Sequence, residues 1–168
     1  NIEAVARGVK MVQDQNPDLI LFTGDLVNNL AKEIEPYKHL LKNLKAPMGK
    51  FAVLGNHDYG EYVDWNSEDE KIENTESIKL HLADMGFSVL NNQRISLHRN
   101  EEHIQIVGVE NWGKPPFPAY GDLDNALKGI NNDDFTILMS HDPDHWEEKT
   151  LLHSKNINLT LSGHTHGM

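Results

Sequence analysis

The chain has 168 residues, the length of one ordinary domain, and carries 26 acidic side chains against 15 basic ones. The formal charge of −11 argues against duplex nucleic acid as a partner, because nonspecific binding depends on Lys and Arg that neutralise phosphates. There is no cysteine, so any metal ion must bind to carboxylate, imidazole or amide groups. An anionic substrate is compatible with this charge, since bound divalent cations can reverse the sign of the potential inside a cleft.

In the first half of the chain, apolar residues at helical spacing alternate with short apolar runs that are typical of buried strands. The first helix is expected from Ile2 to Val12, and Asn16-Pro17 ends it. The other elements expected here are a strand at 19–22, a helix at 31–44, a strand at 51–54 and a helix that begins at Asn74 or Thr75 and ends at Asp84. The acidic segment 61–76 is interpreted as a solvated loop and helix start.

The second half begins with strand-like periodicity and returns to alternating helices and strands. The expected elements are strands at 88–90, 94–98 and 104–109, the last two forming a hairpin, then a helix at 123–130, a strand at 135–139, a helix at 144–152 and a strand at 157–161. The proline-containing segment 113–121 is expected to be a stiff loop. This order predicts an α/β fold with two packed sheets and outer helices, in a single domain over residues 1–168.

Four polar clusters directly follow predicted strands. They are Gly24-Asp25, Gly55-Asn56-His57-Asp58, Ser140-His141 and Gly163-His164-Thr165-His166-Gly167. Strands that end in loops bearing Asp, Asn or His are how an α/β scaffold assembles a metal site from distant segments. The sequence therefore indicates a metal site.

The cluster at 56–58 combines an Asn, a His and an Asp. The amide oxygen of Asn56 is a neutral, hard metal ligand, and His57 can donate a proton, with Asp58 orienting its ring and raising its pKa. Read alone, this cluster is equally compatible with an ordinary turn in which Asn56 is left-handed. Gly24-Asp25 is also common turn chemistry, although the two oxygens of Asp25 can bridge two cations.

The His164-Thr165-His166 cluster is the strongest local signal. In extended backbone, alternate residues project to the same side, so both imidazoles can face one site. The alternative is a pair of exposed histidines in a polar turn. His141 is expected at a strand end as a ligand, whereas His145 is assigned to the helix surface or to a position behind the ligands.

Together, Asp25, Asn56, His141 and His164 provide four oxygen or nitrogen ligands for one cation. Asp25 and His166 are then left for a second cation. Such a ligand set suits Mn, Fe, Zn, Mg or Co, and the sequence does not choose among them.

These clusters, in this order, resemble the calcineurin-like metallophosphoesterases. The family pattern is Asp-x-His, Gly-Asp, Gly-Asn-His-Asp/Glu, a lone His and Gly-His-x-His, and four of these five elements are present between Gly24 and Gly167. Gly-Asp-Leu-Val at 24–27, His-Asp-Pro at 141–143 and the cluster at 163–167 are most similar to the bacterial branch related to membrane-associated phosphoesterases. The resemblance implies a four-layer α/β/β/α sandwich with two mixed β-sheets.

The resemblance also implies a mechanism with two divalent metal ions. Asp25 would bridge the ions, with Asn56, His141 and His164 completing one site and His166 serving the other. The bridging hydroxide would attack phosphorus in line, while His57, held by Asp58, protonates the leaving oxygen. The substrate would be a phosphorylated small molecule, a lipid or a nucleotide sugar, with monoester, diester and pyrophosphate all open.

One element of the family pattern is absent, since no Asp-x-His precedes Asp25. With Asn1 at the start and Met168 just after the last motif, the sequence is interpreted as a partial domain that lacks its first strand and C-terminal strands. Such a piece is expected to hold one cation and to be weakly active or inactive. A missing N-terminal segment is a candidate for peripheral membrane association, giving a cytoplasmic or membrane-associated location in a bacterium.

Two other classes of protein share parts of this pattern. The metallo-β-lactamase fold also uses His-x-His, but it needs Asp-His shortly afterwards, and Gly167-Met168 leaves no room for it. A non-catalytic binding or scaffold module that retains metal binding is the remaining alternative, which the proton donor His57 disfavours. Aromatic residues near the clusters could hold a base, sugar or acyl chain, or simply pack: Tyr59, Tyr62, Trp65, Trp112 and Phe117.

Overall fold

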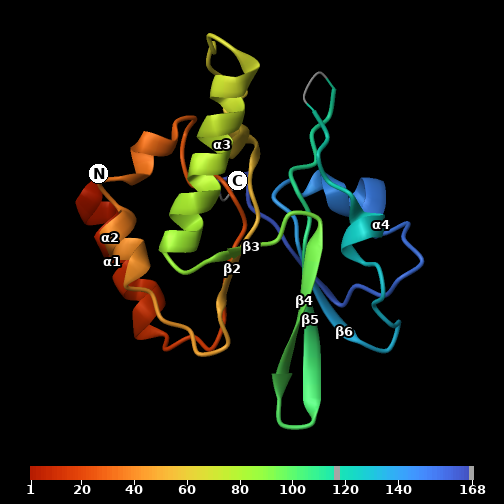
Figure 1. Ribbon diagram of the computed structural model, residues 1–168. Helices are drawn as coiled ribbons and strands as arrows, with labels where there is room; N and C mark the ends of the chain where they lie inside the picture. Colours follow the sequence, from red (N-terminus) through yellow and green to blue (C-terminus); the bar gives the residue numbers. More distant parts are fainter. Residues whose placement is uncertain (116–117, 167–168) are drawn as a thin grey trace.

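In the computed structural model, which describes residues 1–115 and 118–166, two β-sheets are packed face to face between helices (Figure 1). Sheet A contains the parallel strands β1 (Ile20–Phe22), β2 (Lys50–Ala52) and β3 (Ser88–Val89). Sheet B contains β4 (Gln93–Arg99), β5 (Glu102–Gly108), β6 (Phe135–Met139) and β7 (Leu159–Leu161). The two-sheet α/β fold is confirmed. Both sheets are expected to mix parallel and antiparallel strands. Sheet B does so, since β4 and β5 are antiparallel and its other pairs are parallel, whereas the strands of sheet A are all parallel.

Helices flank the paired sheets on both sides. The α-helices are α1 (Ile2–Asp14), α2 (Lys38–Lys42), α3 (Glu68–Asp84) and α4 (Leu123–Ala126). Three short helical turns complete the set: η1 (Ala31–Ile34), η2 (Asn56–Tyr59) and the π-helix η3 (Trp146–Thr150). Figure 1 shows α1, α2 and α3 on the side of sheet A and α4 on the side of sheet B. Within the described ranges, none of the helices has the length and apolar character needed to cross a bilayer.

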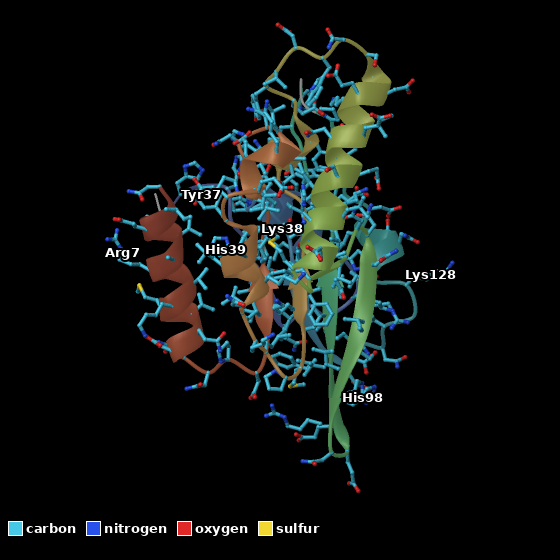
Figure 2. All side chains as sticks on the ribbon, turned by 60° about the vertical axis from the view of Figure 1, so that its left-hand side comes forward. Arg7, Tyr37, Lys38, His39, His98 and Lys128 are labelled. Atoms are coloured by element: carbon cyan, nitrogen blue, oxygen red, sulfur yellow. The ribbon has the colours of Figure 1, made fainter. Side chains whose placement is uncertain are left out.

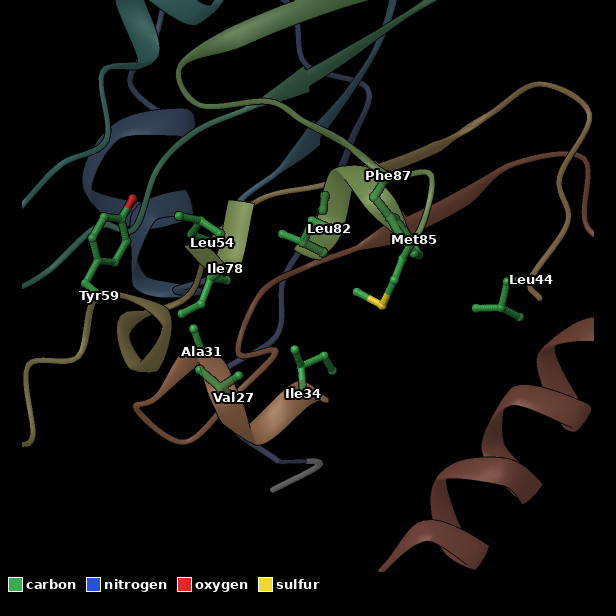
Figure 3. Close-up of a cluster of buried hydrophobic side chains, with 11 residues drawn as sticks. Val27, Ala31, Ile34, Leu44, Leu54, Tyr59, Ile78, Leu82, Met85 and Phe87 are labelled. Carbon is green, nitrogen blue, oxygen red and sulfur yellow. The ribbon is translucent and has the colours of Figure 1, made fainter. Parts of the chain in front are cut away.

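Side chains alternate between the faces of each strand, and this alternation builds three layers of core. Phe51 and Val53 pack between the sheets against Ile106 and Met139. Residues next to them in the strands, such as Val107, point to the outer face and pack under α4. The core between sheet A and its helices includes Leu54, Ile78, Leu82, Met85 and Phe87 (Figure 3).

Two predicted helices differ from the structure. The helix expected at 31–44 is split into η1 and α2 on either side of Pro36, which has no backbone N–H to donate to a preceding carbonyl oxygen. The helix expected from Asn74 or Thr75 begins instead at Glu68. Ser67 caps it by accepting a hydrogen bond from the backbone N–H of Glu70 at 3.2 Å, and the acidic first turn favours the positive end of the helix.

The C-terminal third also differs in detail. The helix expected at 123–130 is reduced to α4, and Gly129, with a φ of 79°, lies in the turn that follows. The helix expected at 144–152 is helical over 144–150, and its last five residues form the π-helix η3. Strand β6 has the predicted bounds, and the β4–β5 hairpin is confirmed, with His98 near its far end (Figure 2). The strand expected at 88–90 is β3, which pairs with β2 in sheet A and not with the hairpin.

Core packing under α3 can be tested with two leucines of the same helix. Leu82 is 1% exposed, whereas Leu80 is 71% exposed. We expect Leu82→Ala to lower the free energy of unfolding by about 3 kcal/mol, because it removes buried methyl groups and leaves a cavity. Leu80→Ala should change it by less than about 0.5 kcal/mol. Urea denaturation measures both, and equal effects would contradict this packing.

Candidate metal centre

The turns that follow β1 and β2 lie in contact, because the carboxyl ends of parallel strands meet at one edge of a sheet. Gly24 has a φ of 99°, and a Cβ atom there would lie 2.7 Å from His141 Nδ1. A Cβ atom at Gly55 would overlap Asp25 Oδ1. Both positions therefore require glycine, which lets Asp25 and Asn56 approach each other.

The carboxylate of Asp58 ties these two turns together. It accepts backbone hydrogen bonds from Asp25 at 2.9 Å, Leu26 at 2.8 Å, Val27 at 3.3 Å and Gly55 at 2.9 Å. The side chain is completely buried. Burial raises the pKa of Asp58 to about 6 and the charge of Asp25 acts in the same direction, against the lowering effect of the backbone N–H groups. Asp58 is a structural anchor of the turns.

The ring of His57 is oriented by a different group from the one predicted. Its Nδ1 lies 2.6 Å from the carbonyl oxygen of Asn28, so the Nδ1–H donates there. The expectation that Asp58 holds this ring is wrong, because the Asp58 oxygens bind backbone amides. Tyr62 packs against the His57 ring with centroids 4.7 Å apart, and the His57 backbone N–H donates to Asp25 Oδ1 at 3.1 Å.

Four of the five predicted metal ligands converge on one point. Ligand atoms of Asp25, His141 and His164 all lie within 4.8 Å of one another. Asn56 Oδ1 lies 2.9 Å from both His141 Nε2 and His164 Nδ1, and these two nitrogens are 3.1 Å apart. Asp25 Oδ2 is 3.3 Å from His141 Nε2. Donors bound to one cation at about 2.1 Å and at right angles are about 3 Å apart, so the donor set and its spacing fit a divalent metal ion.

Two further contacts aim the donor atoms. His141 Nδ1 lies 2.7 Å from the carbonyl oxygen of Thr23, so Nδ1–H donates there and the Nε2 lone pair faces the cluster. The amide nitrogen of Asn56 donates to the hydroxyl of Tyr62 at 2.7 Å, which turns Oδ1 toward the histidines. Sequence reasoning missed Thr23 and Asn28, since a backbone carbonyl carries no signal in the residue type.

The electrostatics of the cluster favour a cation. Burial alone would lower the pKa of His141, but its hydrogen bond to Asp25 and the charge of that carboxylate raise it above the ordinary value. Burial would raise the pKa of Asp25, but the hydrogen bond and charge of His141 lower it. The carboxylate thus stabilises positive charge at this position, which a proton or a metal ion can supply.

His166 lies outside the four-donor cluster. The φ angles of His164 and His166 are 67° and 53°, so the extended backbone expected at this cluster is wrong. His166 instead lines a cavity of about 220 Å³ together with Asp25 and His57. Phe117 and Gly167 lie outside the described residues.

His145 is completely buried, which excludes the expected surface position. Its ring centroid lies 5.6 Å from that of Trp112, and neither ring nitrogen has a hydrogen-bond partner within 1–115 and 118–166. His145 thus packs against Trp112 of the 111–115 loop and is not part of the donor cluster.

The chain is similar to known proteins over nearly its whole length. The family described as "Calcineurin-like phosphoesterase" matches residues 1–168. An uncharacterized metallophosphoesterase of Bacillus subtilis, YkuE, is 32% identical over 176 residues, which cover 99% of this chain and 53% of the relative. The UDP-2,3-diacylglucosamine pyrophosphatase LpxG of Chlamydia trachomatis is 29% identical, with 94% of this chain and 56% of the relative covered. The chain thus spans about half the length of these curated relatives.

Among solved structures, the NAD nucleotidase NadN of Haemophilus influenzae is similar in fold. It matches with a TM-score of 0.50 and 19% sequence identity, covering 99% of this chain and 36% of that chain. At this identity the similarity concerns the fold alone.

Metal binding by the four-donor cluster can be measured by calorimetry with Mn²⁺. We expect one tight site per chain, since 1–115 and 118–166 contain one such group. His141→Ala should weaken binding by at least about 100-fold, whereas His39→Ala, on the exposed surface of α2, should not (Figure 2).

Because the pKa of His141 is raised, protons compete with the cation, and affinity should fall as the pH is lowered from 8 to 6. Two equally tight sites, or unchanged binding by His141→Ala, would contradict this assignment.

The anchoring role of Asp58 predicts a large loss of stability on its removal. Asp58→Ala leaves buried backbone N–H groups without an acceptor, so we expect a loss of at least about 3 kcal/mol at pH 7.5 without metal. Asp58→Asn keeps one acceptor oxygen and should lose less. Asp64→Ala, at an exposed position, is the matched control. Thermal unfolding monitored by circular dichroism tests the relative stability of these variants. A similar melting temperature for Asp58→Ala and Asp64→Ala would show that Asp58 does not anchor the turns.

Proposed function

The chain belongs to the calcineurin-like phosphoesterase family, and on that premise we propose that it is a metal-dependent phosphohydrolase. The observation that carries the proposal is the convergence of Asp25, Asn56, His141 and His164 at ligand distances. The proposed reaction is hydrolysis of a phosphate ester or pyrophosphate bond by in-line attack of water.

The four-donor cluster would hold one divalent cation. When bound, such cations lower the pKa of a water molecule and offset negative charge on the phosphoryl oxygens. Asp25 and His166 would contribute to a second cation, together with donors that residues 1–115 and 118–166 do not bring there. The mixed oxygen and nitrogen donors suit Mn, Fe, Zn, Mg or Co.

His57 is the proposed proton donor to the leaving oxygen. Because its Nδ1–H donates to the Asn28 carbonyl, Nε2 is the nitrogen that can transfer a proton. Its backbone N–H donates to Asp25, which keeps the ring next to the metal cluster. Asp58 acts as a positioning residue, since it holds the turn of Asp25 against that of Gly55.

The proposed substrates are phosphorylated small molecules. The pyrophosphatase activity in the name of the Chlamydia trachomatis relative makes lipid-linked and nucleotide-sugar pyrophosphates candidates alongside phosphate esters. The net charge of −11 disfavours duplex nucleic acid.

The role of His57 predicts an effect that depends on the leaving group. With the metal-loaded protein, His57→Ala should lower kcat for an alkyl phosphodiester by about 100-fold or more, because an alkoxide leaves poorly without a proton. For bis(p-nitrophenyl) phosphate the loss should be below about tenfold, since p-nitrophenolate leaves unaided. His39→Ala is the matched control and should keep both rates. Equal losses with both substrates would assign His57 a positioning role, and metal binding without any turnover would favour a scaffold module.

A further inference from the structure

A cavity of about 380 Å³ opens directly beside the four-donor cluster. Asn56 and His164 line it and also supply donor atoms to the cluster. Tyr62 lines it as well and packs against His57. His57 itself lines the neighbouring cavity with Asp25, whereas Tyr62, which contacts its ring, lines this one. A leaving group that extends from the cluster past Tyr62 would enter this cavity.

Much of the cavity wall is aromatic or apolar. Tyr62, Trp112, Pro115 and Pro143 present ring surfaces to it. Trp112 is held in place, because Lys149 Nζ lies 4.7 Å from its ring centroid and the His145 ring packs beside it. A fixed aromatic wall of this kind suits a flat or ring-shaped group, which buries apolar surface there at little cost in side-chain entropy.

The charges in the cavity oppose a second anion. Among the described lining residues, Lys114 is the single Lys or Arg, whereas two carboxylates, Asp142 and Asp144, also line the cavity. Its ammonium group lies 2.9 Å from Asp144 Oδ2 and 3.4 Å from Glu148 Oε1, so its charge is already compensated. A phosphate in this cavity would meet a net negative wall, and like charges at short distance repel.

We propose that this cavity receives the leaving group and selects an uncharged, ring-shaped alcohol over a second phosphate group. The proposal rests on the proposed phosphohydrolase function, and it makes a phosphate ester the preferred substrate rather than a pyrophosphate. Trp112 and the Lys114–Asp144 pair are then the residues that determine specificity.

The test compares two substrates with the same reacting phosphoryl group. Methyl p-nitrophenyl phosphate has an uncharged aromatic leaving group, whereas P1,P2-dimethyl pyrophosphate has an anionic methyl phosphate. With the Mn²⁺-loaded protein, kcat/KM divided by each substrate's rate of hydrolysis without the protein should favour the first by about tenfold or more, which removes the intrinsic reactivity of the leaving group from the comparison. An equal or higher value for the pyrophosphate would overturn the proposal.

Three variants isolate the contribution of charge. Asp144→Asn should reduce this preference by about 2- to 5-fold and Lys114→Gln should increase it by a similar factor, because both side chains are half exposed and screened. Asp133→Asn, at an exposed position outside the cavity lining, should leave the preference unchanged. A preference that does not respond to Asp144→Asn or Lys114→Gln would contradict the charge argument.

If neither substrate is hydrolysed, that result counts against the proposed phosphohydrolase function but not against the selectivity of the cavity. The selectivity of the cavity can then be tested by a binding measurement. The indole N–H signal of Trp112, assigned with Trp112→Phe, can be followed by NMR in the metal-free protein. We expect p-nitrophenol to shift this signal and methyl phosphate to leave it in place. A shift by methyl phosphate of equal size, or no shift by p-nitrophenol, would overturn the proposal.

Discussion

The hydrogen bonds of the buried Asp58 carboxylate hold together the two turns on which the metal centre is built. Its oxygens accept N–H groups from the turn after β1 and from Gly55 after β2, so the two segments share one acceptor. A buried carboxylate is costly unless it is hydrogen-bonded, and the backbone donors offset much of that cost. The close approach of Gly24 and Gly55 that results leaves no room for a Cβ atom, and it brings Asp25 beside Asn56.

The other half of the donor cluster comes from sheet B. His141 and His164 follow β6 and β7, and the two loops are joined by the hydrogen bond from the Gly163 N–H to the His141 carbonyl oxygen. The apolar layer between the sheets fixes how far these loops stand from Asp25 and Asn56. The metal centre therefore depends on the packing of both sheets. A change in that packing would move Asp25 and Asn56 away from His141 and His164.

Several cavities adjoin the donor cluster, and two of them differ in chemistry. The one lined by Asp25, His57 and His166 carries the groups proposed for proton transfer and for a second cation. The one lined by Trp112 and Lys114 carries none of the cluster's carboxylate, and its lining includes two aromatic side chains and two prolines. The reacting phosphoryl group and its leaving group thus meet different environments, and the 111–115 loop can alter specificity without moving a metal ligand.

Local patterns in the sequence predicted the strands and the polar residues that follow them. Apolar runs specify strands such as β6 through burial, and Asp25, Asn56, His141 and His164 are conspicuous because few residue types bind hard cations. The predicted start of α3 lies too far along the chain, because the cap at Ser67 precedes the first apolar position of the helix by several residues.

Apolar patterns and residue types are enough to predict the α/β class, the succession of strands along the chain and the chemistry of the donor set. The binding of backbone amides by Asp58, the orientation of His57 by the Asn28 carbonyl and the position of His166 outside the donor cluster follow only from the three-dimensional structure. The physical reason is that these outcomes depend on backbone atoms and φ angles contributed by segments far apart in the chain. Residue types record what a side chain can bind, whereas packing determines which partner reaches it.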